Sequence, residues 1–469
     1  MVSGFVGAKS EAALTAQQLI KAYATGQLSP VEVTQTLLDD IADANDQLGA
    51  FVAINTQGAL RSAQDAERQW SSWRKDHGQS EQIDWQQLPS WGLPVSVKDT
   101  IEMAGMPTTY GSLAFAEHYK PDSPLVTKLR AAGSVILGKT NTSEFALSMI
   151  TATRQAATAR NPYDLSRTAG GSSGGAAAAT AAGWGILGLG TDSVGSIRQP
   201  AAYCGLYGLK PTFGRVRNPQ TWRASPVRSH LGPLVRHEDD LVFSWRVLTG
   251  DPRPIFPIDP SDLGGRLRVA SLLDDPDDGA VLSEGLGLLQ QLGFIETVPK
   301  PLRLSEPPNV HSTDGDWIFA ADHYAAAEKL IPGFMDANRD KLTDYARRIY
   351  ETGTRIPAWE YRTLAASIED YRETSQEIFA HTDLIVTSVA GEPPVLEASG
   401  HLGDLGPEYP NLSVWNLAGN PALTIPLKRD KNGLPRSIQL VARHGEDRLL
   451  IALALSLARV ASPVMTRSQ

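Results

Sequence analysis

The sequence predicts an α/β fold, because short apolar strand-like segments alternate along the chain with helix-like ones. A strand-like segment at 93–97 is followed by a helix-like one at 123–132 and by a second short strand at 135–137. An alanine-rich helix over 176–182 and a strand over 185–190 continue the alternation. This order of elements is typical of a sheet whose faces are covered by helices.

Two helices are predicted ahead of these strands, over residues 14–24 and 30–45. The second follows a capping box at 29–32 (Ser-Pro-Val-Glu) with proline at the first helical position. Its apolar residues recur at helical spacing and give it one apolar face: Val33, Leu37, Leu38 and Ile41. The stretch 69–90 is polar and charged with widely spaced tryptophans, so we predict a surface excursion there.

The second half of the chain carries weaker signals. Residues 250–265 are rich in Pro and Asp and are predicted to form a loop that leads into a more variable middle region. Segments 384–386 and 422–425 are predicted to be strands that return to the sheet, and 447–460 to be a closing apolar helix.

Composition and charge exclude several classes of protein. The 469 residues are 42% hydrophobic and 20% charged, and the formal net charge is −9. The acidic and basic residues are scattered along the chain, which disfavours direct nucleic-acid binding. No stretch reaches the roughly 18 apolar residues of a membrane span, and the first residues do not resemble a secretory signal. The lone Cys204 excludes an intrachain disulfide and a multi-cysteine metal site. We therefore expect a cytoplasmic protein.

Two glycine- and serine-rich segments are the most informative part of the sequence. The first is 170–175 (Gly-Gly-Ser-Ser-Gly-Gly), and the second is 190–200 (Gly-Thr-Asp-Ser-Val-Gly-Ser-Ile-Arg-Gln-Pro). Ser196 follows an apolar strand in a turn whose consecutive N–H groups can converge on an anion. Lys98 likewise follows a strand, at 95–97. Because open α/β sheets place their sites beyond the carboxyl ends of strands, we expect both groups at neighbouring strand ends.

These segments resemble the characteristic motifs of the amidase signature hydrolases. The resemblance extends to 204–212 (Cys-Gly-Leu-Tyr-Gly-Leu-Lys-Pro-Thr) and to 415–422 (Trp-Asn-Leu-Ala-Gly-Asn-Pro-Ala). The resemblance covers most of the chain. The family it points to contains both stand-alone amidases and the glutaminase component of glutamyl-tRNA(Gln) amidotransferase. It implies a large mixed twisted sheet with helices on both faces. It also implies one domain in four parts: N-terminal helices (1–65), a signature core (66–250), a variable substrate-pocket region (265–380) and a C-terminal return to the sheet (381–469).

The resemblance implies hydrolysis of a carboxamide through a serine acyl-enzyme. Carried over by position, Ser196 matches the family's nucleophile, Ser172 its cis-bonded relay serine and Lys98 its base. A serine hydroxyl is a weak nucleophile until a base takes its proton, and lysine acts as a base only when neutral. Burial depresses the pKa of lysine, so we expect Lys98 to be enclosed. No metal or organic cofactor is required.

An oxyanion hole is expected from backbone N–H groups of the nucleophile loop. The donors implied are the N–H groups of Ser193, Val194, Gly195 and Ser196. Supporting roles are expected for three further side chains: Ser173, Asp192 and Arg198. Many members of the family carry glycine where this chain has Val194. Valine excludes positive φ, so either the loop is locally altered or the pocket is narrowed at that position.

Two other catalytic classes match short motifs. Residues 133–140 satisfy the Walker A pattern of nucleotide hydrolases, although 135–137 is itself a strand candidate, which argues against a phosphate-binding loop. Segments 170–174 and 171–175 each match the nucleophile elbow of His-assisted α/β-hydrolase esterases. That arrangement needs a strand directly before the serine, whereas 161–166 is turn-like.

A third alternative keeps the family and changes the role. The glutaminase component of a tRNA-dependent amidotransferase is expected to hold the substrate carboxylate with an arginine upstream of strand 384–386. Ile368 lies near that position, which favours a stand-alone amidase acting on a small-molecule amide. We expect no membrane partner and allow for a homodimer. Aromatic residues of the variable region are candidates for the acyl pocket, although core packing explains each one more simply: Trp317, Phe319, His323, Tyr324, Trp359 and Tyr361.

Overall fold

The computed structural model describes most of the chain. It covers residues 14–77, 84–88, 90–217, 225–263, 265–272, 279–298, 302–303, 311–312, 315–396 and 410–461. None of the helices within these ranges is long and apolar enough to cross a membrane.

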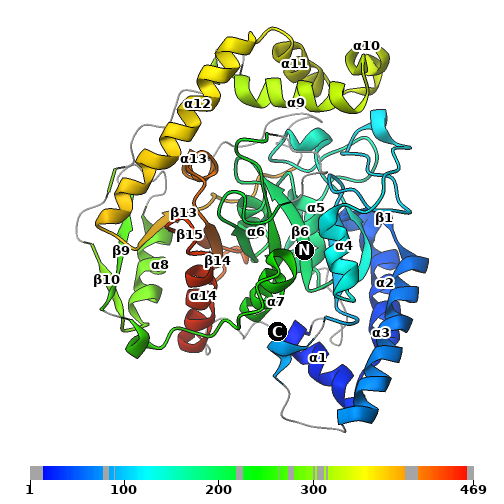
Figure 1. Ribbon diagram of the computed structural model, residues 1–469, viewed down its shortest axis with the longest axis vertical. Helices are drawn as coiled ribbons and strands as arrows, with labels where there is room; N and C mark the ends of the chain where they lie inside the picture. Colours follow the sequence, from blue (N-terminus) through cyan, green and yellow to red (C-terminus); the bar gives the residue numbers. More distant parts are fainter. Residues whose placement is uncertain are drawn as a thin grey trace.

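A mixed sheet runs through the centre of the molecule (Figure 1). Its strands lie in the order β1-β3-β2-β6-β8-β7-β14-β15-β13-β9-β10 within the described residues. Their bounds are β1 Phe51–Ile54, β2 Pro94–Lys98, β3 Val135–Thr140, β6 Leu187–Asp192, β7 Tyr207–Lys210, β8 His230–Val235, β9 Leu267–Ser271, β10 Ile295–Thr297, β13 Leu384–Ser388, β14 Ala422–Pro426 and β15 Ser437–Ala442. The predicted α/β class and mixed sheet are confirmed, as are the returning strands β13 and β14.

The neighbouring strands β2 and β6 are parallel, with Val95 paired to Leu187 and Val97 to Leu189. Their carboxyl ends therefore meet at one edge of the sheet. Strands β6 to β8 and β7 to β14 pair antiparallel. This order brings the C-terminal strands beside the signature core.

Helices cover both faces of the sheet, and the central ones are short and rich in small residues. Those of the core are α4 Pro124–Ala131, α5 Gly174–Ala181, α6 Arg198–Tyr203, α7 Glu238–Thr249, α8 Ala280–Gln290, α13 Pro410–Ala418 and α14 Asp447–Ala461. Every residue of α5 is buried. Gly175 shows why: a Cβ there would lie 2.4 Å from the backbone nitrogen of Asn141, so only glycine lets the helix approach so closely.

The two predicted N-terminal helices are confirmed as α1 (Ala16–Thr25) and α2 (Pro30–Leu48). The Ser29 hydroxyl accepts hydrogen bonds from the N–H groups of Val31 and Glu32, which satisfies donors at the start of α2. Gly49, in the left-handed region at φ 64°, ends the helix.

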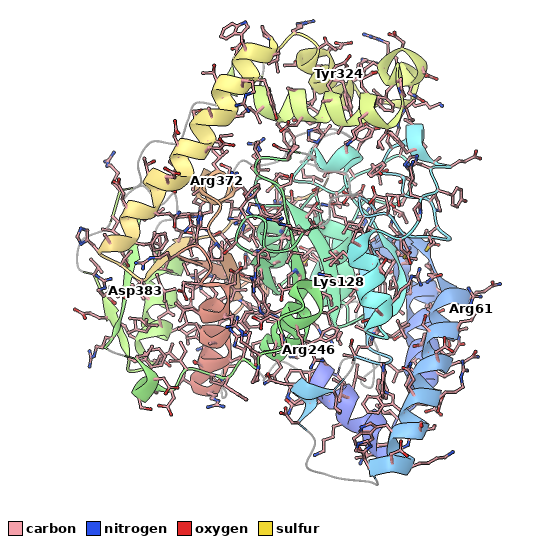
Figure 2. The ribbon with its side chains drawn as sticks, in the orientation of Figure 1. Arg61, Lys128, Arg246, Tyr324, Arg372 and Asp383 are labelled. Atoms are coloured by element: carbon pink, nitrogen blue, oxygen red, sulfur yellow. The ribbon has the colours of Figure 1, made fainter. Side chains whose placement is uncertain are left out.

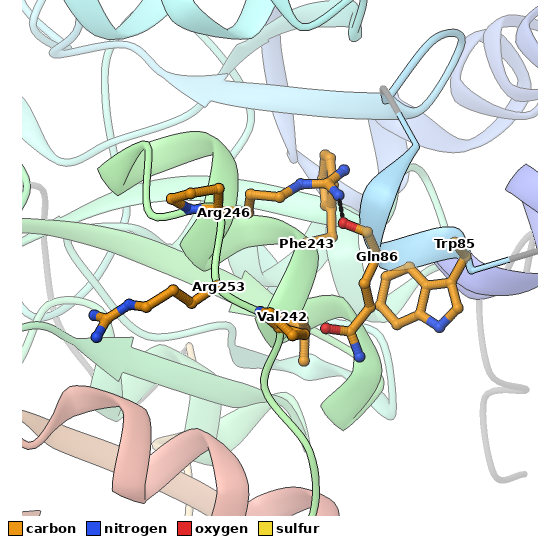
Figure 3. Close-up of a pocket in the computed structure, with 8 residues that line it drawn as sticks. Trp85, Gln86, Val242, Phe243, Arg246 and Arg253 are labelled. Carbon is orange, nitrogen blue, oxygen red and sulfur yellow. Dashed lines mark hydrogen bonds between the residues drawn. The ribbon is translucent and has the colours of Figure 1, made fainter.

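The predicted surface excursion at 69–90 is wrong over its first part. Helix α3 runs from Thr56 to His77, and Trp70 on it is fully buried, with its indole N–H donating to the Trp91 carbonyl at 3.0 Å. The buried stripe of α3 consists mainly of alanines, so polar neighbours mask its helical periodicity. The short η2 (Trp85–Gln87) is also anchored, because Arg246 of α7 donates to the Gln86 carbonyl (Figure 3).

The turn-like interpretation of 161–166 is also wrong in part. Strands β4 (Arg160–Asn161) and β5 (Asp164–Thr168) form a hairpin within this stretch. On the edge of β5 that does not pair with β4, the segment after β13 is hydrogen-bonded to the strand, because Leu396 N donates to the Ser166 carbonyl at 2.9 Å. That partner lies more than two hundred residues away in the sequence, so no local pattern reveals the strand.

The first part of the predicted variable region contributes β9, α8 and β10 to the central sheet and its cover, whereas residues 317–374 form a layer of helices, here called the cap, at one end of the molecule (Figure 1). The cap consists of α9 Trp317–Leu330, α10 Phe334–Asn338, α11 Asp344–Gly353 and α12 Ala358–Thr374, with the small strands β11 His311–Ser312 and β12 Gly315–Asp316 before it. Phe319 and His323 are buried, Tyr324 and Tyr361 are partly buried, and Trp359 is 71% exposed. The side chain of Trp317 lies outside the described residues.

Candidate active site

Three segments converge at the carboxyl edge of the central strands. Lys98 is the last residue of β2, Ser172 lies between β5 and α5, and Ser196 lies between β6 and α6. The N–H of Ser173 donates to the Ser196 carbonyl at 3.3 Å, which joins the two serine segments. The expectation that Lys98 and Ser196 emerge from neighbouring strand ends is met by the pairing of β2 with β6.

The side-chain nitrogen of Lys98 is surrounded by hydroxyl groups. Its Nζ lies 2.7 Å from Ser172 Oγ, 2.9 Å from Ser173 Oγ and 2.8 Å from Thr191 Oγ1. The side chain is completely buried. Burial lowers the pKa of Lys98 well below its ordinary value, and the negative charge of Asp192 opposes this lowering. The site therefore favours a neutral lysine.

The peptide bond between Gly171 and Ser172 is cis, as the resemblance implied. A Cβ on Gly171 would lie 2.7 Å from the Ser148 carbonyl oxygen, so the position accepts only glycine. The Gly171 N–H donates to Gln199 Oε1 at 2.9 Å. Gln199 in turn donates to the Met149 carbonyl at 3.2 Å, so one side chain of α6 ties two active-site segments together.

Ser196 is nearly buried, and its hydroxyl lies 3.9 Å from the sulfur of Met149. Residues 193–196, here called the nucleophile loop, turn sharply at Gly195, whose φ is +123°. Val194 keeps an ordinary negative φ, because the left-handed position falls one residue later. A branched residue therefore fits at 194 without any unusual backbone conformation.

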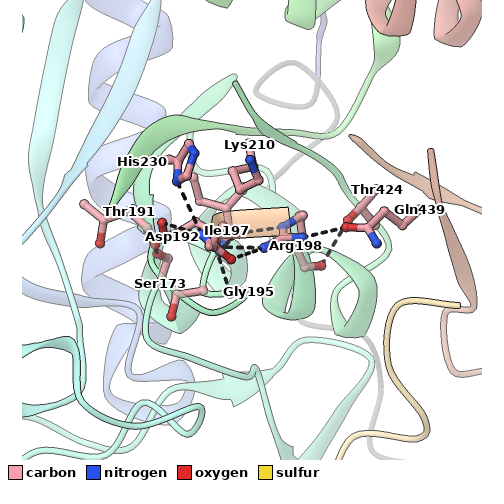
Figure 4. Close-up of polar contacts among 12 residues, drawn as sticks. Ser173, Thr191, Asp192, Gly195, Ile197, Arg198, Lys210, His230, Thr424 and Gln439 are labelled. Atoms are coloured by element: carbon pink, nitrogen blue, oxygen red, sulfur yellow. Dashed lines mark hydrogen bonds and ion pairs between the residues drawn. The ribbon is translucent and has the colours of Figure 1, made fainter. Parts of the chain in front are cut away.

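The Asp192 side chain is hydrogen-bonded to the backbone of the nucleophile loop and of the residue after it. Its carboxylate accepts hydrogen bonds from Gly195 N at 2.7 Å and from Ile197 N at 3.2 Å (Figure 4). The N–H of Gly195 is therefore engaged within the protein. The N–H groups of Ser193, Val194 and Ser196 make no hydrogen bond within the described residues, which leaves three of the four expected oxyanion donors available.

Asp192 is paired with Arg198, and both side chains are fully buried. Arg198 Nε lies 2.9 Å from Asp192 Oδ2, and Nη2 lies 3.0 Å from Oδ1. Burial alone would raise the pKa of Asp192, but the Arg198 guanidinium and its hydrogen bonds hold the pKa well below its usual range. Two of the three remaining guanidinium N–H groups donate to Gln439 Oε1 (Figure 4) and to Asn416 Oδ1, each at 2.6 Å.

Four residues of this site are not among those that the sequence singled out. Thr191 carries the third hydroxyl on Lys98, Met149 packs beside the nucleophile, and Asn416 and Gln439 satisfy Arg198. Thr191 lies within the motif at 190–200, next to Asp192, so its position in the sequence could have identified it as a residue of the site. Gln439 lies on β15 with no such signal, because its role depends on a contact across 241 positions.

The Walker A interpretation is excluded by β3, which runs through residues 135–140 as a strand. Lys139, the lysine of that motif, is fully buried and lies 2.8 Å from Asp99 Oδ1, so it faces a carboxylate rather than a phosphate site. The elbow interpretation is weakened because Ser172 contacts Lys98 and, among the residues that the structure describes, no hydrogen bond joins it to a histidine. Within the described residues, no group of three His, Cys, Asp or Glu side chains is arranged to hold a metal ion.

Comparison with known proteins adds three findings. The family model described as Amidase matches residues 32–451. AmiB2 of Mycobacterium tuberculosis, provisionally named as an amidase, is 31% identical over 96% of this chain and 95% of its own length. In Symbiobacterium thermophilum, the A component of glutamyl-tRNA(Gln) amidotransferase is 30% identical over 95% of this chain and 96% of its own length.

The fold has a solved counterpart as well. The native peptide amidase of Stenotrophomonas maltophilia superposes with a TM-score of 0.76 and 25% identity, over 96% of this chain and 97% of that chain. The agreement extends over almost the whole of both chains, so it includes the cap as well as the sheet.

Proposed function

The chain belongs to the amidase family and hydrolyses amide C–N bonds, and we propose that it does so with Ser196 as nucleophile, Ser172 as relay and Lys98 as base. The observation that carries this assignment is the burial of Lys98 with its Nζ 2.7 Å from Ser172 Oγ. A lysine kept neutral by burial can take a proton from a hydroxyl that it contacts.

Proton counting around Lys98 supports a relay through Ser172. A neutral lysine has two N–H groups and one lone pair, yet its nitrogen is in contact with the three hydroxyls named above. The proton of Ser173 goes to the Thr191 carbonyl at 3.1 Å, so Ser173 accepts from Lys98. Either Ser172 or Thr191 must then donate to the lone pair. We assign this role to Ser172, which directly precedes Ser173, whose N–H donates to the Ser196 carbonyl at 3.3 Å.

The proposed reaction assigns one step to each of these groups. Lys98 takes the Ser172 proton while Ser172 takes that of Ser196, and Ser196 Oγ bonds to the substrate carbonyl carbon. The oxyanion is stabilised by the free N–H groups of the nucleophile loop. The C–N bond then breaks as Ser172 gives a proton to the leaving nitrogen and takes one back from Lys98, which becomes neutral again. Water hydrolyses the acyl-enzyme through the same relay.

Ser173, Asp192 and Arg198 are proposed to support this arrangement rather than to react. Ser173 bridges Lys98 and the backbone of Thr191, since its hydroxyl also accepts from Thr191 N at 3.2 Å. Asp192 orients Gly195 and Ile197, and Arg198 neutralises Asp192.

The experiment that tests the function measures ammonia or amine release from a panel of aliphatic and aromatic amides that includes glutamine and asparagine. The wild-type chain is compared with Ser196→Ala and with Ser261→Ala, an exposed serine of η5 (Pro260–Asp262). Release lost only in Ser196→Ala supports the assignment. Release that persists in Ser196→Ala refutes the nucleophile.

The same panel separates the stand-alone enzyme from the partner-dependent alternative. Glutamine hydrolysis that requires added partner proteins would favour the amidotransferase role, in line with the relative from Symbiobacterium thermophilum. A cytoplasmic location and a homodimer remain predictions, which cell fractionation and light scattering on the purified chain will test.

A further inference from the structure

The turn formed by residues 225–229, here called the bridging turn, lies between the nucleophile loop and the cap. Ser225 and Arg228 in it are buried, and Ser229 is partly buried. Its position next to Ser193 on one side and next to α9 and α12 on the other is defined by the contacts below. Neither the proposed relay nor the Asp192–Arg198 pair uses this turn.

The first contact joins the bridging turn to the nucleophile loop. Ser229 Oγ lies 2.7 Å from Ser193 Oγ, and it also accepts a hydrogen bond from Ser225 N at 2.9 Å. The Ser229 N–H donates back to the Ser225 carbonyl at 2.8 Å. The Ser193 side chain is thereby held against a small, internally bonded turn.

The second set of contacts joins the bridging turn to the cap. The Ser225 hydroxyl donates to the carboxylate of Asp322 on α9, and the Tyr361 hydroxyl of α12 donates to the other carboxylate oxygen at 2.7 Å. Arg372, which lies on α12 (Figure 2), donates to the Val227 carbonyl. Asp322 is only 6% exposed, so these bonds are shielded from water.

Asn416 provides a second support at Asp192, directly before the nucleophile loop, and its Nδ2 also donates to the Arg228 carbonyl of the bridging turn at 3.4 Å. Asn416 Nδ2 donates to the Asp192 carbonyl at 3.0 Å and to its carboxylate at 2.8 Å. The side chains of the consecutive residues Asp192 and Ser193 therefore have different supports. Asp192 is held by Arg198 and Asn416. Ser193 is held by Ser229 of the bridging turn, which is bonded through Ser225 to Asp322.

We propose that Asp322 and Ser229 are positioning residues for amide hydrolysis, which fix Ser193 and with it the direction of the N–H groups of Ser193 and Val194. This inference rests on the proposed function. The oxyanion exists only in the transition state, so misdirected donors lower kcat with little effect on KM. The cap thereby acts on the chemical step.

The test compares steady-state kinetics on the best amide of the panel for Ser229→Ala, Asp322→Ala and the double variant. Each single change should lower kcat by about tenfold with KM within about twofold, and the double variant should be no worse than the more impaired single variant, because both act along one path. Ser229→Thr keeps the hydroxyl and should retain most of kcat. Ser261→Ala, the exposed control named above, should change kcat by less than about threefold.

A second readout separates positioning from general loosening of the fold. A boronic acid that forms a tetrahedral adduct on a serine hydroxyl should bind Ser229→Ala more weakly by the same factor as kcat falls. The carboxylic acid product, which lacks that geometry, should bind both proteins equally. An unchanged kcat in Ser229→Ala, additive effects in the double variant, or equal weakening of both ligands would overturn the inference. Absence of Ser196-dependent hydrolysis in the wild type would instead refute the proposed function.

Discussion

At the residue scale, the central feature is a buried lysine whose partners are hydroxyl groups. An ion pair would keep Lys98 charged, whereas the three hydroxyls satisfy its nitrogen without supplying a counter-charge. The acid whose charge acts on it, Asp192, is already neutralised by Arg198. Burial is therefore the main influence on the pKa of Lys98, and the neutral lysine can act as the base in place of a histidine.

This arrangement predicts the pH dependence of the reaction. Lys98 is active when deprotonated, so kcat/KM should be constant above its pKa and fall as pH drops below it. Because burial lowers that pKa, the fall should occur well below the ordinary lysine range. A pH profile of kcat/KM measures it. An activity that appears only as pH approaches 10.5 would contradict a depressed pKa.

Variants of Lys98 give the matching mutational test. Lys98→Ala removes the base and Lys98→Arg keeps a group that stays charged, so both should lower kcat/KM by about 10²- to 10⁴-fold. Thermal unfolding of the two proteins serves as the control for folding. Near-normal activity in Lys98→Arg would show that no neutral base is needed at this position.

Thr191 is predicted to matter through its hydroxyl rather than its shape. Thr191→Val removes one of the three contacts of Lys98 Nζ and should lower kcat/KM by about 2- to 10-fold, as expected for a hydrogen bond between neutral groups worth about 0.5–1.5 kcal/mol. Thr191→Ser keeps the hydroxyl and is the matched control. Equal activities in the valine and serine variants would show that the contact is dispensable.

At the scale of elements, the nucleophile loop is a short link between β6 and α6 whose conformation depends on one buried ion pair. Asp192 belongs to the strand and Arg198 to the helix, so their pairing fixes how the two elements approach each other. The hydrogen bonds from Gly195 N and Ile197 N to the same carboxylate extend this control to the loop itself.

Removal of Arg198 should therefore destabilise the protein as well as inactivate it. Arg198→Met leaves Asp192 buried without its counter-charge, which typically costs about 3–5 kcal/mol of unfolding free energy. The urea midpoint of unfolding should fall, and amide hydrolysis should fall with it. Arg68→Met is the control, because the Arg68–Asp65 pair is mostly exposed and its loss should hardly move the midpoint. Equal midpoints for both variants would contradict the assigned role of the pair.

At the scale of the whole molecule, the N-terminal helices are attached to the core by a buried carboxylate. Asp240 on α7 accepts a hydrogen bond from the first N–H of α1, at Ala16, over 2.7 Å. Burial raises the pKa of Asp240 to about 8, although this hydrogen bond and Arg236 act in the opposite direction. The folded chain therefore holds a proton there that the unfolded chain releases at lower pH.

The sign of the resulting pH effect on stability follows from proton binding. Between about pH 4 and the folded pKa of about 8, the native state binds more protons at Asp240 than the unfolded state, so stability decreases as pH rises. Asp240→Asn should remove this part of the slope. Urea midpoints at pH 5 and pH 8 measure it, and a wild-type slope that is unchanged in Asp240→Asn would refute the effect.

Much of the site and the framework could be predicted from the amino-acid pattern because the relevant signals are local. The motifs at 170–175 and 190–200 indicated Ser172, Ser196 and their neighbours, and the alternation of strands and helices indicated the α/β class. The N-terminal helices followed from Ser29, Pro30 and the apolar spacing after them. Signals of this kind can be read from a single sequence because backbone propensity and helix capping act over a few residues.

The remaining features required the folded chain, because the contacts that define them join residues that are far apart in the sequence. Strand β5 is completed by residue 396, Trp70 becomes core through Trp91, and Arg198 is satisfied by Gln439. Local motifs were enough to indicate which groups carry the chemistry and where each stands along the chain. Which hydroxyls meet Lys98, and which helices hold Ser193, depended on how the sheet order brings distant segments to one edge.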